Sequence, residues 1–154
     1  MRRVVLDSNA VDPLIDIPGA YEAVRAAIDA GRLEVLYTHV TTDELADTRD
    51  PDRRRRLLLA VQGLGRLVPT GAFIVGISRL SFAHPSDDVE AVETLRSNNV
   101  AHSPDALIAI TAAHEGCALA TNETRRLPAR ARQRGIEVLT SADLLAFIGF
   151  EGAA

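Results

Sequence analysis

Residues 4–9 read VVLDSN. The apolar run at the start of this stretch is typical of a buried strand, and it stops abruptly at Asp7. Two small polar residues, Ser8 and Asn9, follow it. A turn closed by side chains would explain this ending. In parallel sheets, however, the carboxyl ends of strands are also where functional groups gather, so the rest of the chain decides between the two interpretations.

The length and composition are those of one globular domain. With 154 residues, 47% of them hydrophobic and 25% charged, the chain is expected to form a single domain over 1–150 with a short tail at 151–154. No apolar run approaches the roughly 20 residues that cross a bilayer, and the charged N-terminal stretch is not a signal peptide. The single cysteine, Cys117, cannot form an internal disulfide. We therefore expect a cytoplasmic protein that does not contact membranes.

The charge pattern excludes several kinds of chemistry. The net charge of −4 argues against non-specific coating of nucleic acid. All 17 basic residues are arginine, because the chain contains no lysine. The lack of lysine excludes a P-loop, Schiff-base catalysis and any phosphotransfer site that depends on lysine.

Apolar runs alternate with helical patterns along the chain. We predict strands at 3–7, 33–38, near 67–69, 117–121 and 136–140, and helices at 18–31, 40–49, 50–65, 86–99, 103–116 and 141–150. Residues 70–83 are expected to be irregular or helical. Strands separated by helices of this length predict an α/β fold, with a central parallel β-sheet of four to five strands flanked by helices on both faces.

Helix starts and stops have recognisable signals. Asp50 before Pro51, Ser86, and Ser103 before Pro104 each predict an N-cap. Asn98 or Asn99 would end the 86–99 helix.

Four acidic residues follow or adjoin the predicted strand ends. Asp7 ends the first strand, and Glu44 lies in the helix after the second. The 117–121 strand leads through Asn122 to Glu123, and the helix before that strand begins with Asp105. In a parallel sheet all four positions lie at one edge, because helices antiparallel to the strands begin there.

Each acid also has an ordinary structural explanation. Asp7 can close a turn, and Glu44 three residues after Thr41 fits a capping box. The helix dipole alone favours Asp105, and Glu123 can be a plain loop charge. Together, however, crowded carboxylates raise one another's pKa unless a positive charge compensates. A divalent cation with oxygen ligands, Mg²⁺ or Mn²⁺, is the simplest compensator.

The histidines do not form a rival metal site in the sequence. His39, His84, His102 and His114 are scattered, without the HxxxH spacing or a cysteine cluster. His102 lies close in sequence to Asp105 and could support that acid, but a structural role is the simpler explanation for it.

With these residues identified, the chain resembles the PIN-domain ribonucleases of the VapC-like toxin type over essentially its whole length. The family's successive motifs correspond here to LDSN at 6–9, VTTDELAD at 40–47, SPDALIAITAA at 103–113 and ATNE at 120–123. The fourth acid departs from the family, because Glu123 stands where Asp is more common. The extra acids Asp12 and Asp16 are expected on the surface.

The resemblance implies a metal-dependent endoribonuclease that uses Mg²⁺ or Mn²⁺. The implied catalytic residues and metal ligands are Asp7, Glu44, Asp105 and Glu123, and the implied supporting residues are Ser8, Asn9, Thr121 and Asn122. In such sites carboxylate-held cations neutralise charge on the phosphodiester. Asp47 shares the helix face of Glu44 and is the first substitute candidate.

Arginine is then expected to bind the RNA backbone, because its planar side chain bonds phosphate through two N–H groups. The run with Arg125, Arg126 and Arg130 begins just after Glu123 and is the better candidate. The RRRR run at 53–56 is expected to be solvated surface that pairs with nearby acids, or to meet an acidic partner.

Other functions fit less well. An aspartate-nucleophile phosphatase needs a second Asp where Asn9 stands, and it needs a lysine, as does a phospho-accepting receiver domain. An inactive PIN scaffold stays open, although all four acidic positions are filled. Within the nuclease interpretation, the resemblance implies the homodimeric toxin of a toxin–antitoxin pair, held by a small antitoxin protein. An RNA-processing nuclease outside such a pair is the alternative.

Overall fold

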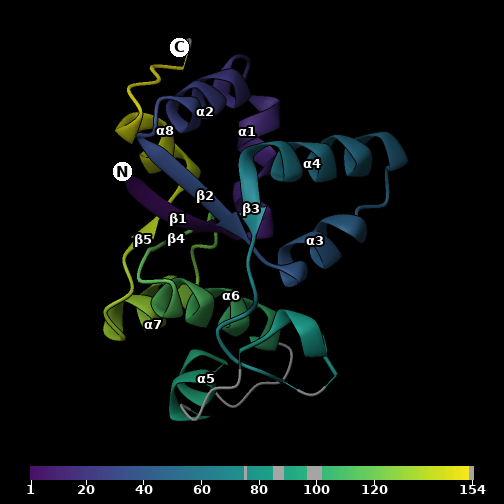
Figure 1. Cartoon of the computed structure of the whole chain (residues 1–154), viewed down its shortest axis with the longest axis vertical. Helices are drawn as coiled ribbons and strands as arrows, with labels where there is room; N and C mark the ends of the chain where they lie inside the picture. Colours follow the sequence, from purple (N-terminus) through teal and green to yellow (C-terminus); the bar gives the residue numbers. More distant parts are fainter. Residues whose placement is uncertain (75, 85–88, 97–101, 153–154) are drawn as a thin grey trace.

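A five-stranded parallel sheet forms the centre of the molecule. The structure is a computed structural model that describes residues 1–74, 76–84, 89–96 and 102–152 (Figure 1). In spatial order the strands are β3 (Gly65–Leu67), β2 (Leu33–Tyr37), β1 (Arg2–Leu6), β4 (Ala118–Ala120) and β5 (Val138–Leu139). Every neighbouring pair is parallel. The predicted α/β class with its parallel sheet is therefore confirmed.

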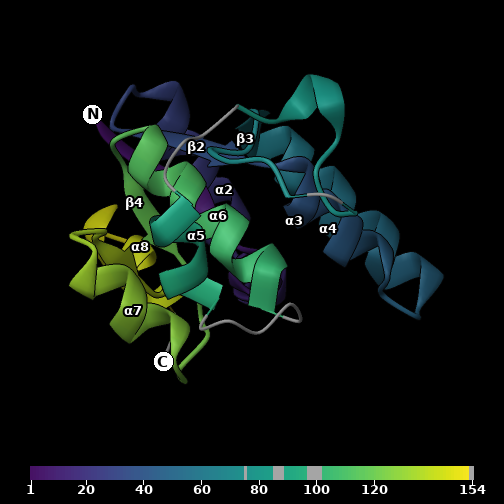
Figure 2. The ribbon, with the colours of Figure 1, turned by 90° about the horizontal axis from the view of Figure 1, so that it is seen from below.

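Helices cover both faces of this sheet. One face carries α1 (Asp12–Asp16), α2 (Ala20–Asp29), α4 (Pro51–Leu64) and α8 (Ser141–Phe147), and the other carries α5 (Val89–Arg96), α6 (Ser103–His114) and α7 (Leu127–Gln133) (Figures 1 and 2). The chain passes through α3 (His39–Ala46) between β2 and α4, and through the short 3₁₀ turns η1 (Ser8–Ala10) and η2 (Leu80–Phe82). Within the described ranges, no helix is long and apolar enough to span a bilayer.

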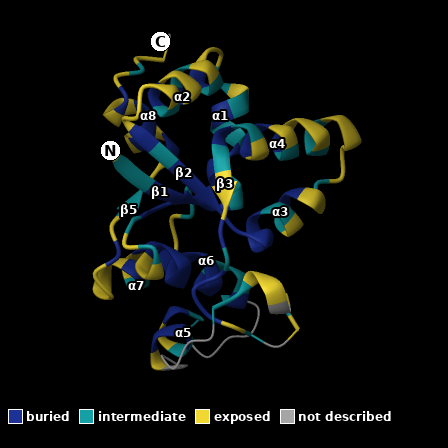
Figure 3. Cartoon of the chain, in the orientation of Figure 1, coloured by how far each residue is buried: buried dark blue, intermediate teal, exposed yellow. Residues whose placement is uncertain are grey.

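Alternate side chains of the central strand enter different cores. Val4 and Leu6 belong to the cluster formed with α1, α2, α4 and α8, whereas Val5 belongs to the cluster under α5, α6 and α7. All three are 0% exposed. This explains why the second half of β1, residues 4–6, is a continuous apolar run, since strand positions covered on both faces need apolar residues (Figure 3). The division into a 1–150 domain and a 151–154 tail stays a prediction.

Several local predictions differ from the structure. Neither α1 nor α7 was expected, and the third strand lies at 65–67 rather than near 67–69, because it begins directly where α4 ends. Ser103 is not an N-cap: it lies inside α6, and its buried hydroxyl has no hydrogen-bond partner among the described residues. Ser86, Asn98 and Asn99 lie outside the described residues.

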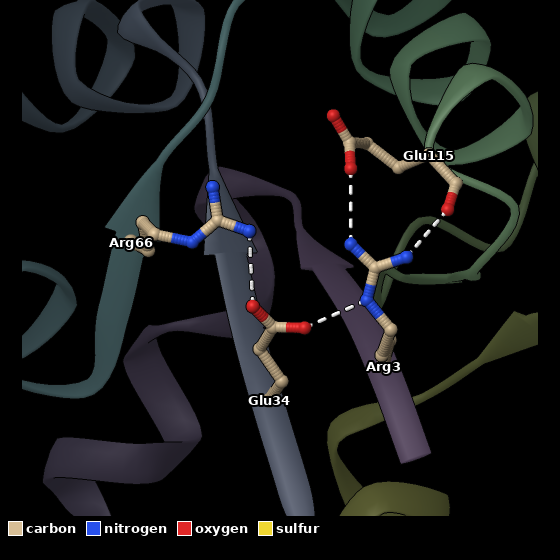
Figure 4. A network of polar contacts seen from close by, with 4 residues as sticks. All are labelled: Arg3, Glu34, Arg66 and Glu115. Atoms are coloured by element: carbon tan, nitrogen blue, oxygen red, sulfur yellow. Dashed lines mark hydrogen bonds and ion pairs between the residues drawn. The ribbon is translucent and has the colours of Figure 1, made fainter. Parts of the chain in front are cut away.

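A network of charged side chains joins three strands near their amino ends (Figure 4). Arg3 of β1 donates to Glu34 of β2 at 2.6 Å, and Arg66 of β3 donates to the other oxygen of Glu34 at 3.0 Å. Arg3 also donates to the carbonyl and carboxylate of Glu115, at 2.7 and 3.0 Å. The hydrogen bonds from Arg3 and Arg66 hold the pKa of Glu34 below its usual range. Each carboxylate in this network therefore has a guanidinium partner.

Candidate active site

Asp7 is buried at the carboxyl end of β1. It is 2% exposed, and its two oxygens accept from the Ser8 amide at 2.8 Å and from the Thr121 hydroxyl at 2.6 Å. Burial raises the pKa of Asp7, while the hydrogen bonds from Thr121 and Ser8 lower it. Asp7 thus closes the turn into η1, as the structural explanation expected, and at the same time places a carboxylate at the sheet edge.

Glu44 reaches the same edge from α3. The Ser8 hydroxyl donates to its carboxylate at 2.6 Å. The capping-box alternative for Glu44 is wrong, because the N-cap of α3 is Thr38 and its box partner is Thr41. Burial is the main cause that raises the pKa of Glu44 to about 7, and the charges of Asp7 and other acids add to it. Glu44 therefore does not cap α3, and its carboxylate lies near the other acids.

Asp105 comes from the first turn of α6. Burial raises its pKa to about 6, and the negative charges of Asp7 and Glu123 add to this shift. His102 and Arg130 act in the opposite direction. The dipole of α6 favours an acid at this position, so Asp105 combines an ordinary helix-start role with proximity to the other carboxylates.

Three carboxylates from three elements consequently repel one another at one edge. The negative charge of Asp7 raises the pKa of both Glu44 and Asp105, and the charge of Asp105 also raises the pKa of Glu44. As they stand, no group of three or more His, Cys, Asp or Glu side chains within the described ranges is arranged to hold a metal ion. The donors are nevertheless all carboxylate oxygens, which is the chemistry that Mg²⁺ and Mn²⁺ prefer.

Amide side chains tie the strand ends together behind these acids. The Asn9 side-chain oxygen accepts from the Asn122 amide at 2.8 Å, and Asn122 donates from its side chain to the Asn9 carbonyl at 3.0 Å. Asn122 also accepts from the Ser141 amide at 2.9 Å, at the start of α8. The ends of β1 and β4 are thereby linked to α8, which keeps Asp7 and Thr121 in register.

Sequence reasoning missed two of the positioning residues. The Thr41 hydroxyl donates to the Leu6 carbonyl at 3.0 Å and so attaches α3 to the end of β1. Ser141 donates to the Ala10 carbonyl at 2.9 Å. Both are small hydroxyl residues at helix starts, where a capping role is the usual expectation, and their long-range partners leave no local signal in the sequence.

Glu123 lies near the acids but is bonded to backbone. Its carboxylate oxygens accept from the Arg125 amide at 2.6 Å and from the Leu127 amide at 3.1 Å. Its charge contributes to the raised pKa values of Asp7 and Asp105. The expected role of Glu123 as a ligand of a second ion stays a prediction.

An arginine-lined hollow of about 710 Å³ adjoins the acids. Its lining residues are His102, Asp105, Asn122, Glu123, Thr124, Arg125, Arg126, Leu127 and Arg130. Asp105 belongs both to the acidic edge and to this hollow, so the two features are continuous. The hollow therefore presents both cationic side chains and carboxylates to a bound ligand.

The other charged runs make surface contacts. Arg53 pairs with Asp12 and, at 2.8 Å, with Asp16, so the first residue of the RRRR run ties α4 to α1. Asp16 is exposed and Asp12 is partly exposed, in line with the expectation of a surface role. Arg79 pairs with Asp43 at 2.6 Å, beside Glu44 in sequence. The negative charge of Asp47 raises the pKa of Glu44.

Comparison with known proteins gives a structural likeness without a sequence one. No model of a known protein family and no curated protein matches the chain significantly, whereas 27 chains of solved structures do. A likeness that is visible only in three dimensions is expected when strand order is kept while residues diverge.

Three of the matched structures span nearly the whole chain. PAE2754 from Pyrobaculum aerophilum has a TM-score of 0.61 at 20% identity, over 96% of this chain and 90% of that one. VapBC2 from Rickettsia felis, bound to a DNA fragment from their promoter, has a TM-score of 0.57 at 12% identity, over 90% of this chain and 98% of that one. DNA-bound VapBC from Salmonella typhimurium has a TM-score of 0.52 at 14% identity, over 92% of this chain and 99% of that one. At such identities the likeness establishes the fold alone. The chain thus has a PIN-like α/β fold, as the resemblance of its motifs implied.

Proposed function

We propose that the protein is a metal-dependent endoribonuclease that hydrolyses phosphodiester bonds of RNA with Mg²⁺ or Mn²⁺. The observation that carries the proposal is the convergence of Asp7, Glu44 and Asp105 from three separate elements, with the pKa of each raised chiefly by burial and further by the charge of at least one neighbouring acid. Buried carboxylates this close together lower the stability of the fold unless a cation is bound, so a purely structural role does not explain them.

Asp7, Glu44 and Asp105 would hold the ion. A divalent cation bound there would neutralise charge on the phosphodiester and promote attack by water. Ser8 and Thr121 fix the carboxylates through hydroxyl hydrogen bonds, each 2.6 Å long, to Glu44 and Asp7. Such bonds orient the acids before substrate arrives and reduce the reorganisation that catalysis requires.

RNA would lie along the arginine-lined hollow. Arg125, Arg126 and Arg130 line it together with Asp105, so a bound phosphate chain would lead from the arginines to the acids. Arginine contacts to phosphate position the backbone without reading bases. The proposed substrate is single-stranded or structured RNA, as the family resemblance implies, bound chiefly through its phosphates.

The biological setting that we propose is the toxin of a type II toxin–antitoxin pair, acting in the cytoplasm as a homodimer with a small antitoxin protein. The likeness in fold to two VapBC structures over at least 90% of this chain supports this partner class. A short reading frame upstream that encodes a DNA-binding segment would support the pair. Its absence would favour an RNA-processing nuclease.

The test is an RNA cleavage assay with Mg²⁺ or Mn²⁺ on the wild type, Asp7→Asn and Asp105→Asn. We expect each substitution to reduce cleavage roughly 100-fold or more while the fold persists, because an ion ligand is lost. Glu22→Gln is the matched control, since Glu22 is an exposed acid of α2. Activity that survives both substitutions, or that is insensitive to chelator, would contradict the proposal, and inactivity of the wild type would favour the scaffold alternative.

A further inference from the structure

Both carboxylate oxygens of Glu123 are engaged by the backbone that follows it. One accepts from the Arg125 amide at 2.6 Å and the other from the Leu127 amide at 3.1 Å. The Glu123 amide itself donates to the Thr121 hydroxyl at 3.1 Å. The side chain therefore folds forward along its own chain and closes a loop over residues 124–126, all of which are exposed.

This loop supplies the missing cap of α7. The residue at the N-cap position, Arg126, makes no side-chain cap hydrogen bond, and Pro128 has no amide hydrogen. The Leu127 amide would be an unsatisfied donor at the helix start without an acceptor from outside the helix. The Glu123 carboxylate is that acceptor, and its negative charge also suits the positive end of the helix.

The same bonds fix the wall of the hollow. Leu127 and Ala131 bury the inner side of α7 in the core, at 2% and 0% exposure. Arg125 and Arg126 lie between Glu123 and this anchored helix, and both line the hollow with Arg130. The backbone of the two exposed arginines is thus held at one end by Glu123 and at the other by the buried face of α7.

We infer that Glu123 is a positioning residue for the arginine wall and that it is not a ligand of the metal ion. The inference rests on the proposed function, because it assigns the RNA-contacting surface of the same site. Asp7, Glu44 and Asp105 then hold the ion without a fourth carboxylate, and Glu123 acts on RNA affinity through Arg125 and Arg126.

Glu123→Gln separates the two roles. Glutamine keeps the length and one acceptor oxygen, but its NH₂ group cannot accept from a backbone amide. Mn²⁺ affinity is measured by calorimetry without RNA, and RNA affinity is measured without divalent ions. We expect the dissociation constant for Mn²⁺ to rise less than about fivefold, because Glu123 also acts on Asp7 and Asp105 through its charge, and that for RNA to rise about threefold or more as the wall loosens. Faster amide exchange at Leu127 would accompany this rise.

The two hypotheses predict opposite signs for RNA. Removal of a negative charge beside the arginines should by itself tighten RNA binding, so a weaker complex reports lost positioning. A tenfold or greater loss of Mn²⁺ affinity, the size expected when a metal site is damaged, would overturn the inference, as would RNA binding that is unchanged or tighter.

Glu123→Asp guards against misfolding of the glutamine variant. Aspartate reaches the Arg125 amide, two residues on, more readily than the Leu127 amide, four residues on. We expect unchanged Mn²⁺ affinity and RNA affinity between those of wild type and Glu123→Gln. Glu22→Gln controls for the lost charge. If the wild type binds no Mn²⁺, the proposed function fails, while the metal-free RNA measurement still tests the role of Glu123.

Discussion

Two groups of carboxylates at opposite ends of the same parallel strands have opposite electrostatics. Near the amino ends, Glu34 receives hydrogen bonds from Arg3 and Arg66, which lower its pKa. At the carboxyl ends, burial and neighbouring acids raise the pKa of Glu44 to about 7 and that of Asp105 to about 6. The carboxylates of the first group are paired with arginines of the protein itself. In the second group, the charges of His102 and Arg130 lower the pKa of Asp105 but do not outweigh burial and the neighbouring acids, which is the state expected of a site that awaits a cation.

The largest effect should appear when the charge of Glu44 is removed from metal-free protein. The pKa of Glu44 is raised in the folded state, so its stabilising contribution is present below pH 4.5 and is lost as the pH rises through 7. Glu44→Gln stays neutral at every pH. We expect the variant to be more stable than wild type by about 2 kcal/mol at pH 8 and equally stable near pH 4.

Urea unfolding in chelator at both pH values measures this difference. Asp105→Asn should behave in the same direction, because its pKa is raised as well. If Glu44→Gln were no more stable than wild type at pH 8, the claim that charged Glu44 destabilises the metal-free protein would be wrong.

A smaller effect of opposite sign is expected at the amino-end network. The pKa of Glu34 is lowered in the folded state, so its contribution is present at neutral pH and disappears as the pH falls through the lowered value. Glu34→Gln should therefore cost about 1 kcal/mol at pH 8, less at high salt, because the ion pairs are partly exposed.

RNA cleavage by Glu34→Gln should equal that of wild type at a temperature where both are folded. Unfolding curves at low and high salt give the stability change, with Glu22→Gln as the control for one lost exposed charge. A Glu34→Gln variant that is more stable than wild type at pH 8 would contradict the claim that Glu34 stabilises the fold through its arginine partners.

Much of the fold was predictable because its signals are local. Burial on both faces makes residues 4–6 of β1 a continuous apolar run, and the Asp50–Pro51 pair starts α4 as predicted. The short helices α1 and α7 were not predicted, because five and seven residues are too few to show a helical period. Their stability comes from buried contacts such as those of Leu14 and Leu127, which are tertiary.

The acids of the site were predictable only as a set. Asp7 and Asp105 each perform an ordinary local role as well, so no single motif separates a structural acid from a functional one. The backbone bonds of Glu123 were not foreseen, since they depend on how residues 124–126 turn. The hydroxyl of Thr41 was not foreseen either, because its partner lies 35 residues away.

The most direct test of the central claim is a titration of the wild type with Mn²⁺ at pH 8, followed by thermal unfolding. If the carboxyl-end acids form a divalent-metal site, the unfolding temperature should rise saturably with Mn²⁺, because the ion binds the folded state alone. The rise should vanish in Asp7→Asn and persist in Glu34→Gln. An unfolding temperature that does not respond to Mn²⁺, or that responds equally in Asp7→Asn, would contradict the account.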